Sequence, residues 1–214
     1  MGLLLLVRHG QASFGADDYD VLSATGHEQG RLLGTHLAGL GVRPDLVVRG
    51  GMRRHRETVE AMLATSGWSA PTEVDADWDE FDHVTLVGGM GEELPADRRA
   101  FQDLFERATA RWVGGHTHEG GESYAGFLAR AQTALGRAVE RARTGTVVVV
   151  SSGGPIGAVA ATLMDPTDPG RLWSGFNTVL VNSSVTRVVV GRSGTRLLTF
   201  NEHPHLAGDT ITYR

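Results

Sequence analysis

The stretch Leu3-Leu4-Leu5-Leu6-Val7-Arg8-His9-Gly10 decides the fold of this chain. Its run of apolar residues predicts a strand that is buried on both faces of a sheet, and Gly10 allows a sharp turn where the strand ends. In open α/β sheets, ligands bind beyond the carboxyl ends of the strands, so Arg8 and His9 lie where a site is expected. Arg8 offers a planar cation that suits phosphate or carboxylate, and His9 offers a nucleophile or an acid–base group. The alternative is that both side chains only face solvent.

Strands and helices are predicted to alternate along the rest of the chain. This alternation favours a mostly parallel central sheet with helices on both faces, that is, an α/β fold. Strands are expected near 45–48, 72–74, 146–150, 179–190 (with a break near 182–183) and 196–200. Helices are expected from Ser23 or Thr25 to Leu40 and over a second stretch that contains Val59, Met62 and Leu63 and ends at Ser66. Three more are expected over 95–113, from Ser123 to about Arg143, and over 155–164. We expect a single domain over 1–214, in which residues 78–121, rich in glycine and acidic residues, form a small cap over the sheet edge.

Composition excludes several classes of function. The 214 residues carry a formal net charge of −5, which argues against a nucleic-acid or anionic-membrane partner. No apolar run is long enough to span a bilayer, and the first one is too short for a signal peptide, so a cytoplasmic enzyme is expected. The absence of cysteine excludes disulfides and thiolate chemistry. All 20 basic residues are arginine, which excludes a Schiff-base lysine and a P-loop lysine.

Two further polar segments follow predicted strands, as Arg8 and His9 do. Ser151-Ser152-Gly153-Gly154 leads into a helix, whose first backbone N–H groups can hold an oxyanion. Arg53-Arg54-His55-Arg56 lies at another helix start, where cations oppose the helix dipole, so an anionic ligand would relieve the repulsion. Together, the three segments predict an anion site at one sheet edge. The pairs His116/His118 and His203/His205 lack the spacing of a closed metal site and are interpreted as loop residues, so no metal is expected.

These motifs resemble the histidine phosphatase superfamily, in its phosphoglycerate-mutase-like branch, over nearly the whole chain. The residues that carry the resemblance are Leu6–Ala12 (LVRHGQA), Leu22–Gly26 with Gln29, Met52–Thr58 (MRRHRET), Glu80 after Trp78-Asp79, Gly121–Ser123 with Arg130, Val147–Gly154, and Asn201 with His205-Leu206.

The resemblance implies a metal-independent phosphatase, without a cofactor, that acts on small phosphorylated metabolites. His9 is then the nucleophile that becomes phosphohistidine. Arg8 and Arg54 hold the phosphoryl oxygens, and Glu80 protonates the leaving oxygen and then assists water. Phosphoryl transfer depends mainly on positioning and charge neutralisation, which fits this set. Gln11 and Gly153 are also expected to contact the substrate or inorganic phosphate.

Ser152 departs from the family pattern, which has a second histidine at this position. A hydroxyl donates one hydrogen bond but brings no positive charge, and losing an oxyanion donor typically costs about a hundred- to a thousandfold in rate. Three outcomes are open: weak activity, another histidine in the same space, or a domain that only binds phosphate ligands. His83 is the candidate replacement, with a solvent-facing loop residue as the alternative. A mutase is the competing enzyme, and a homodimer is left open.

Overall fold

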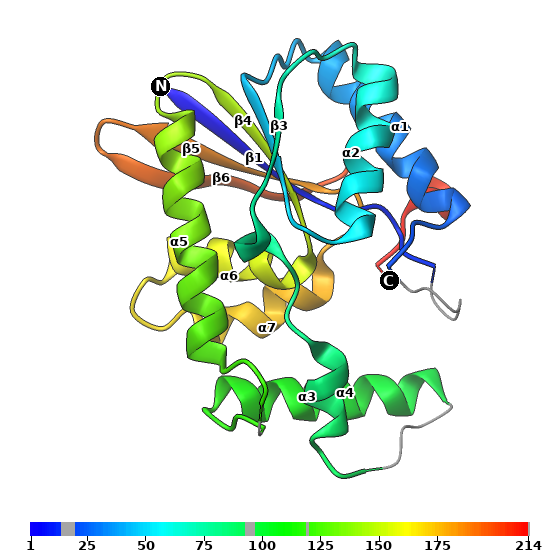
Figure 1. Ribbon diagram of the computed structural model, residues 1–214, viewed down its shortest axis with the longest axis vertical. Coiled ribbons are helices and arrows are strands. Elements are labelled where there is room, and N and C mark those ends of the chain that lie inside the picture. Colours follow the sequence, from blue (N-terminus) through cyan, green and yellow to red (C-terminus); the bar gives the residue numbers. More distant parts are fainter. Residues whose placement is uncertain (14–19, 93–96, 119, 214) are drawn as a thin grey trace.

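A computed structural model describes residues 1–13, 20–92, 97–118 and 120–213 of the chain (Figure 1). Its strands are β1 (Gly2–Arg8), β2 (Leu46–Arg49), β3 (Thr72–Val74), β4 (Thr146–Ser151), β5 (Val185–Gly191) and β6 (Gly194–Glu202). In the described residues they form one sheet in the order β3-β2-β4-β1-β5-β6. β1 to β4 run parallel, and β5 and β6 add an antiparallel edge. The predicted mostly parallel α/β sheet is confirmed.

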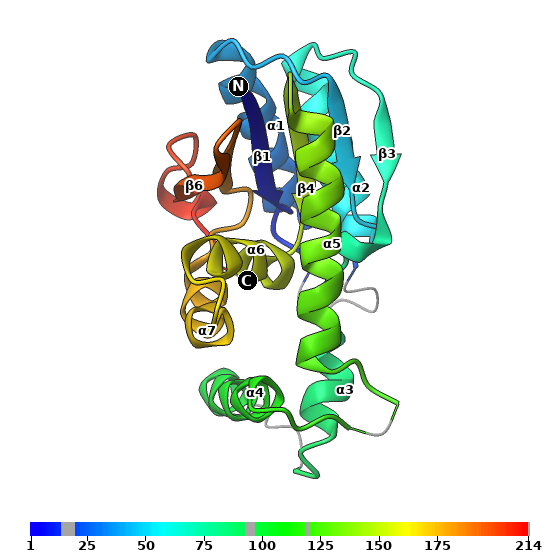
Figure 2. The same ribbon diagram turned by 90° about the vertical axis from the view of Figure 1, so that its left-hand side faces the viewer.

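In the described residues, helices lie on both faces of this sheet and two more lie beyond one of its ends, which Figure 2 shows from the side. They are α1 (Ala24–Gly39), α2 (Arg53–Ser66), α3 (His83–Gly88), α4 (Arg98–Val113), α5 (Tyr124–Ala142), α6 (Gly153–Met164) and α7 (Gly170–Val179), with short 3₁₀ turns η1 (Ala76–Trp78) and η2 (Gly208–Thr210). Ser23 and Ser123 cap α1 and α5 by accepting backbone N–H groups, and Gly67 ends α2 in the left-handed conformation. No helix in the described ranges is long and apolar enough to cross a membrane.

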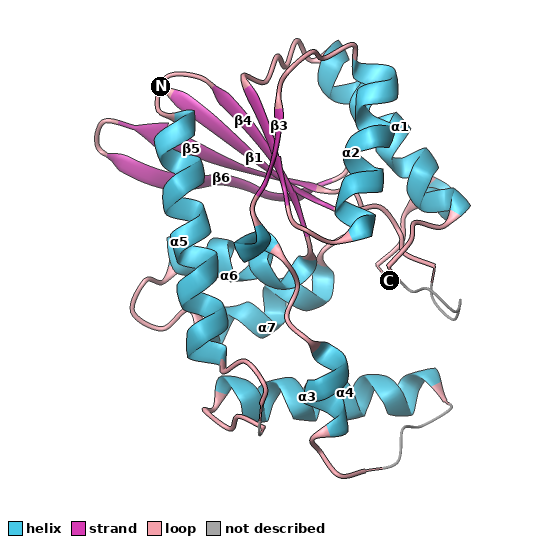
Figure 3. Ribbon diagram, viewed as in Figure 1, coloured by secondary structure: helices cyan, strands magenta, loops and turns pink. Residues whose placement is uncertain are grey.

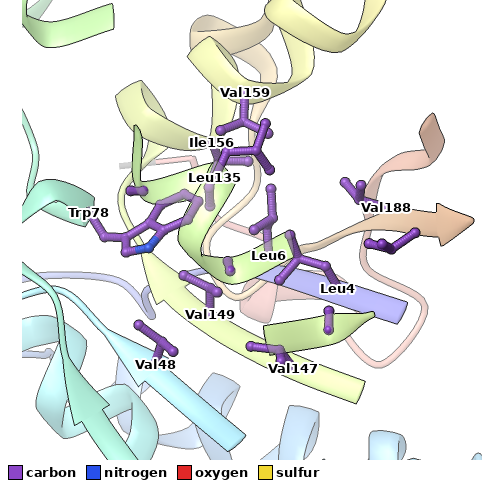
Figure 4. Close-up of a cluster of buried hydrophobic side chains, with 14 of the residues drawn as sticks. Leu4, Leu6, Val48, Trp78, Leu135, Val147, Val149, Ile156, Val159 and Val188 are labelled. Atoms are coloured by element: carbon purple, nitrogen blue, oxygen red, sulfur yellow. The ribbon is translucent and has the colours of Figure 1, made fainter. Parts of the chain in front are cut away.

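Alternate side chains of the central strands pack into two separate hydrophobic cores. On one face, β1 and β4 pack against α5 and α6, and Figure 4 shows this core, which includes Leu4, Leu6, Val147, Val149 and Ile156. On the other face, the intervening residues pack against α1 and α2; this core includes Leu5, Val7, Leu33, Met62 and Val148. Because successive side chains of a strand point to opposite faces, an unbroken apolar run is what a strand covered on both sides requires.

A third core holds the predicted cap against the sheet domain. α3 and α4 lie beyond one end of the sheet, next to α7 and the start of α5 (Figure 3). Their apolar faces meet α5, α6 and α7 in a cluster centred on Phe81, Trp112, Phe127 and Trp173, which pack edge-on or tilted. Such aromatic pairs stabilise beyond the area they bury, by about 0.5–1.5 kcal/mol each. The cap is therefore held by packing.

The observed elements differ from the predicted ones in four places. α3 and α7 were not predicted, and the strand expected from Val179 begins only at Val185, because Val179 ends α7. α7 carries a signal that was missed: Trp173 and Phe176, three residues apart, bury one helical face. The helix expected over 95–113 is observed as α4 from Arg98, and Pro95 lies outside the described residues.

Candidate active site

A cavity of about 190 Å³ opens beyond the carboxyl ends of β1 and β4. Six of the predicted site residues line it: Arg8, His9, Arg54, Glu80, His83 and Gly153. They come from four separate segments, which meet because β1, β4 and β2 are adjacent parallel strands that end at one edge. The register pairs Arg8 with Ser151, so the turns after β1 and β4 lie side by side. This is the place where open α/β sheets bind ligands.

His9 is buried, with 5% of its surface exposed, and its ring is held in one orientation. Its Nδ1 lies 2.6 Å from the carbonyl oxygen of Gly10, and since a carbonyl only accepts, Nδ1 carries the proton. The neutral ring therefore has its lone pair on Nε2. Burial, and next the charges of Arg54 and Arg8, hold the pKa of His9 well below its usual value. His9 is thus a neutral imidazole at neutral pH, with a proton on Nδ1 and none on Nε2, and this is the form of the ring that can act as a nucleophile.

Gly10 lets the turn after His9 pack closely against α1. A Cβ at this position would overlap the carbonyl of Gly26. The backbone N–H of Gly10 donates to Thr58 Oγ1 at 3.0 Å, and the hydroxyl of Thr58 donates to the carbonyl of Arg54. The first turn of α2 is thereby connected to the turn that carries His9, which sets the position of Arg54 relative to the His9 ring.

Two guanidinium groups provide the positive charge of the cavity. Arg8 donates through Nη1 to the carbonyl of Leu180, and a Cβ on Gly153 would lie 3.7 Å from Arg8 Nε, so this cation lies beside the start of α6. Arg54, with only 5% of its surface exposed, donates to Asp20 Oδ1 at 2.7 Å. Guanidinium forks match the geometry of phosphate oxygens. Two arginines and the start of α6 thus lie together at the place where the sequence predicts an anion site.

Glu80 faces the same cavity from the segment that follows η1. Its Oε2 accepts the backbone N–H of Gly154 at 3.1 Å, and its Oε1 accepts the N–H of Phe81 at 3.2 Å. This position requires glycine, because the Cβ of any other residue at 154 would overlap Glu80 Oε1. The carboxyl group therefore has a defined place beside the N-terminal turn of α6, in the same cavity as His9, as an acid–base group requires.

The histidine that contacts Ser152 is His55, whereas His83 was the expected one. Ser152 and His55 are both fully buried, and His55 Nε2 lies 2.8 Å from Ser152 Oγ. His83 begins α3 and lines the outer cavity instead. The sequence shows His55 beside Arg54, but whether it points inward or outward depends on the rotation of α2.

Gln11 lies next to the cavity. Its side-chain oxygen accepts the hydroxyl of Ser23 at 2.8 Å, and it lines a shallower hollow that shares Thr178 and Tyr213 with the main cavity. A role for Gln11 in contacting the phosphoryl group stays a prediction.

The outer part of the cavity was not foreseen from the sequence. Phe101 and Phe105 of α4 and Phe81 form aromatic walls, and Asn177, Thr178 and Tyr213 complete the lining. These residues come from the cap, from α7 and from the C-terminal segment. No motif marks them, and α7 itself was not predicted. Among the described residues, no group of three or more histidine, aspartate or glutamate side chains is arranged to hold a metal ion.

The sheet order and the placement of the cavity define a phosphoglycerate-mutase-like α/β fold. Among solved structures, YhfR from Bacillus stearothermophilus matches with a TM-score of 0.74 and 22% identity, covering 95% of this chain and 98% of that one. A phosphoserine phosphatase mutant from Entamoeba histolytica in complex with phosphoserine matches with a TM-score of 0.71 and 20% identity, over 97% of this chain and 100% of that one. Phosphoglycerate mutase from Bacillus anthracis matches with a TM-score of 0.67 and 20% identity, over 95% and 94%.

The sequence itself shows the family. The model of the histidine phosphatase superfamily (branch 1) matches residues 4–203, and the chain belongs to this superfamily. No curated protein sequence matches the chain significantly. At identities of 20–22%, the solved structures show a shared fold.

Proposed function

We propose that the protein is a phosphatase that hydrolyses small phosphorylated metabolites through a phosphohistidine on His9, without a metal ion. One observation carries the proposal: a buried neutral imidazole, with Nε2 as its unprotonated nitrogen, lines one cavity with two arginines and a glutamate. Related folds belong to a phosphoserine phosphatase and a phosphoglycerate mutase, which fits transfer of a phosphoryl group to the protein as the first step.

The first half-reaction transfers the phosphoryl group to His9. Nε2 attacks phosphorus as the bond from phosphorus to the alcohol oxygen breaks, while Arg8 and Arg54 neutralise the charge on the phosphoryl oxygens. Glu80, in its acid form, gives its proton to the departing alkoxide, so the alcohol leaves neutral. The proton of His9 stays on Nδ1, where its hydrogen bond to the carbonyl oxygen of Gly10 stabilises the phosphorylated ring.

The second half-reaction returns His9 to its starting state. Glu80, now a carboxylate, accepts a proton from a water molecule as that water attacks phosphorus. The bond between phosphorus and Nε2 breaks, inorganic phosphate leaves, and Glu80 is again an acid. Two arginines provide the charge neutralisation, which is why the proposal needs no metal.

The cavity walls favour hydrolysis of an apolar or aromatic phosphomonoester over isomerisation of a phosphorylated sugar acid. Phe81, Phe101 and Phe105 line the same cavity as Arg8, His9 and Arg54. Aromatic walls suit an apolar leaving group, whereas a bisphosphate intermediate calls for further cations. The aromatic rings that line the cavity therefore support hydrolysis over isomerisation.

Trapping the intermediate tests the proposal. The protein is mixed with a ³²P-labelled aryl phosphate and quenched in alkaline detergent, because the phosphorus–nitrogen bond of phosphohistidine is acid-labile. We expect label on His9 in the wild type and none in His9→Ala, with release of free phosphate rather than an isomer. Label absent from a wild type that still binds phosphate would refute the proposal and identify a phosphate-binding protein.

A further inference from the structure

His55 is a fully buried histidine that the proposed hydrolysis does not use. It is the third residue of α2, directly after Arg54. Gly50 makes room for it, since a Cβ there would overlap His55 Nδ1 and come close to Asp79 Oδ1. A buried histidine is costly unless its ring nitrogens have partners. The partners of His55 therefore indicate what it does.

Asp79, His55 and Ser152 lie one after another in a row. His55 is within hydrogen-bond distance of Ser152, whereas its Nδ1 faces Asp79 at a longer distance and makes no hydrogen bond to it. His55 Nε2 lies 2.8 Å from Ser152 Oγ, and His55 Nδ1 lies 3.6 Å from Asp79 Oδ1. Asp79 also accepts the backbone N–H groups of Gly51 at 2.6 Å and Met52 at 3.3 Å. Burial raises the pKa of Asp79, but the contact with His55 and these backbone groups outweigh it and hold the pKa below its usual value. The row of three residues thus ends in a carboxylate.

The other end of this row reaches the catalytic histidine. Ser152 follows β4 as His9 follows β1, the two strands pair in register, and the His9 N–H donates to the carbonyl of Ser151 at 2.9 Å. The rings of His9 and His55 lie 5.7 Å apart. Ser152 is the N-cap residue of α6, yet its hydroxyl makes no capping hydrogen bond and contacts His55 instead. A serine at an N-cap usually bonds the helix, so this hydroxyl has another use.

Burial and the surrounding charges determine the protonation state of the His55 ring. Burial lowers its pKa, Asp79 and Glu80 favour the proton, and Arg54 opposes it. His9 also faces it, across the 5.7 Å between the rings. In the empty site these opposing effects leave the ring neutral at pH 7. A bound phosphoryl dianion adds negative charge beside this row, which favours the imidazolium.

We propose that Asp79, His55 and Ser152 form a proton-binding relay that brings a third positive charge to the phosphoryl group. Ser152 is fully buried directly before Gly153, which lines the cavity. In the relay its hydroxyl turns to donate to the phosphoryl oxygen, and His55 is a positioning residue that acts through Ser152. The proposal rests on the proposed function, because the phosphoryl group it serves is the one transferred to His9.

The relay takes up and releases one proton in each cycle. When the dianion binds, a proton from solvent adds to His55 Nε2, while Nδ1–H points at Asp79. Nε2–H then donates to Ser152 Oγ, and the hydroxyl hydrogen of Ser152 rotates to donate to a phosphoryl oxygen. When phosphate leaves, Nε2 returns its proton to solvent and accepts the Ser152 hydroxyl again. No bond between heavy atoms changes.

Competitive inhibition by sulfate tests the relay, because sulfate remains a dianion across pH 5–9. In the wild type, we expect its inhibition constant to rise about tenfold for each pH unit between the pKa of His55 in the free protein and its higher pKa in the sulfate complex, since binding takes up one proton in this range. In His55→Gln the constant should lose this slope, and kcat should fall about a hundredfold, as for a lost oxyanion donor. His116→Gln, at an exposed position in the loop after α4, is the control that should keep the wild-type slope.

A purely structural role for His55 predicts a different result. It would lower the melting temperature or kcat equally at all pH values and leave the sulfate slope unchanged, and a wild-type slope in His55→Gln would overturn the proposal. Asp79→Asn is the second variant, expected to shift the slope towards lower pH because it removes the charge that favours the imidazolium. An unshifted profile in this variant would also count against the relay.

Exchanging the two side chains adds an independent arm. The double variant His55→Ala with Ser152→His moves the histidine from α2 to the start of α6. Its kcat should be at least about tenfold higher than that of His55→Ala alone, which is a non-additive result. A folded double variant no better than His55→Ala would refute the proposal. Nitrogen-15 NMR of the histidine rings detects protonation of His55 by sulfate without turnover. Failure of the phosphohistidine test is therefore distinguishable from failure of the relay.

Discussion

Replacing Gly154 by alanine should separate catalysis from folding in this protein. A Cβ at position 154 would overlap Glu80 Oε1 and lie 3.0 Å from two carbons of the Phe81 ring. The backbone of Gly154 cannot easily retreat, because its carbonyl accepts the Trp173 Nε1–H at 3.0 Å in the buried cap core. The free end of the Glu80 side chain is therefore the group that moves.

The size of the effect follows from the overlap. Non-bonded heavy atoms need about 3.5 Å of separation, so the carboxyl group of Glu80 must shift by on the order of 1 Å and lose the N–H of residue 154. A misplacement of about 1 Å typically costs about a hundredfold in rate. Because Arg8 and Arg54 are untouched, KM should change by no more than about threefold, so the loss falls on kcat.

Gly157 provides the matched control in the same helix. A Cβ at Gly157 meets its nearest atom, the backbone nitrogen of Asn177, at 3.5 Å, which is an ordinary contact. Gly157→Ala should keep wild-type kcat and gain up to about 1 kcal/mol of stability from helix propensity. Steady-state kinetics on an aryl phosphate and thermal unfolding of both variants provide the comparison.

A second background shows whether Glu80 carries the effect. In Glu80→Gln, adding Gly154→Ala should cost little further activity, because two changes that act through one group are not additive. The reasoning is refuted if Gly154→Ala retains the kcat of Gly157→Ala. It is also refuted if the loss in the Glu80→Gln background equals the loss in the wild type.

Three further predictions follow from the same structure. Phe105→Ala should raise KM for an aryl phosphate by about tenfold and leave KM for a small alkyl phosphate nearly unchanged, because the ring lines the leaving-group end of the cavity; equal effects on both would contradict an aromatic subsite. The lowered pKa of His9 should keep kcat/KM from falling at pH 6.5, with the acidic limb appearing well below it in a pH–rate profile. Burial, and next the proximity of His36, lower the pKa of His205 to about 4. Since the unfolded chain then binds more protons, the free energy of unfolding should decrease as the pH falls from 6.5 towards 4, and urea titrations should show a shallower decrease in His205→Gln.

The local pattern of the sequence was sufficient to predict most of the sheet and the edge at which the cavity lies. The apolar run that ends in Arg8 and the β-branched run that ends at Ser151 are each enclosed between two helical layers. Strands of this kind need no tertiary information, because only burial on both faces tolerates such a run. Arg54 and Glu80 were predicted from the family resemblance, and they line the cavity with His9. The resemblance itself agrees with the family match over residues 4–203.

Short elements, and elements without a clear hydrophobic period, could not be predicted from the sequence pattern. α3 has six residues, too few for a helical period to register. The apolar pair Leu180-Val181 follows α7 directly, and its β propensity suggested a strand that begins too early. The aromatic rings that wall the cavity are spread over the cap and are separated by loops. Their common orientation depends on how α4 packs on α5 and α7, which no local signal encodes.

The sequence alone determined that His9 follows a buried strand and that Ser152 occupies the position of a second histidine in the resemblance. Only the tertiary structure decided which histidine meets Ser152. His55 and Ser152 are 97 residues apart, and they touch because β2 and β4 are neighbours and because the rotation of α2 turns His55 inward, beside Arg54. That rotation is set by the packing of Val59 and Met62 in the core under α2. A side chain three residues after Glu80 and one directly after Arg54 are equally plausible from the sequence, because composition and spacing carry no information about which of them faces the sheet edge.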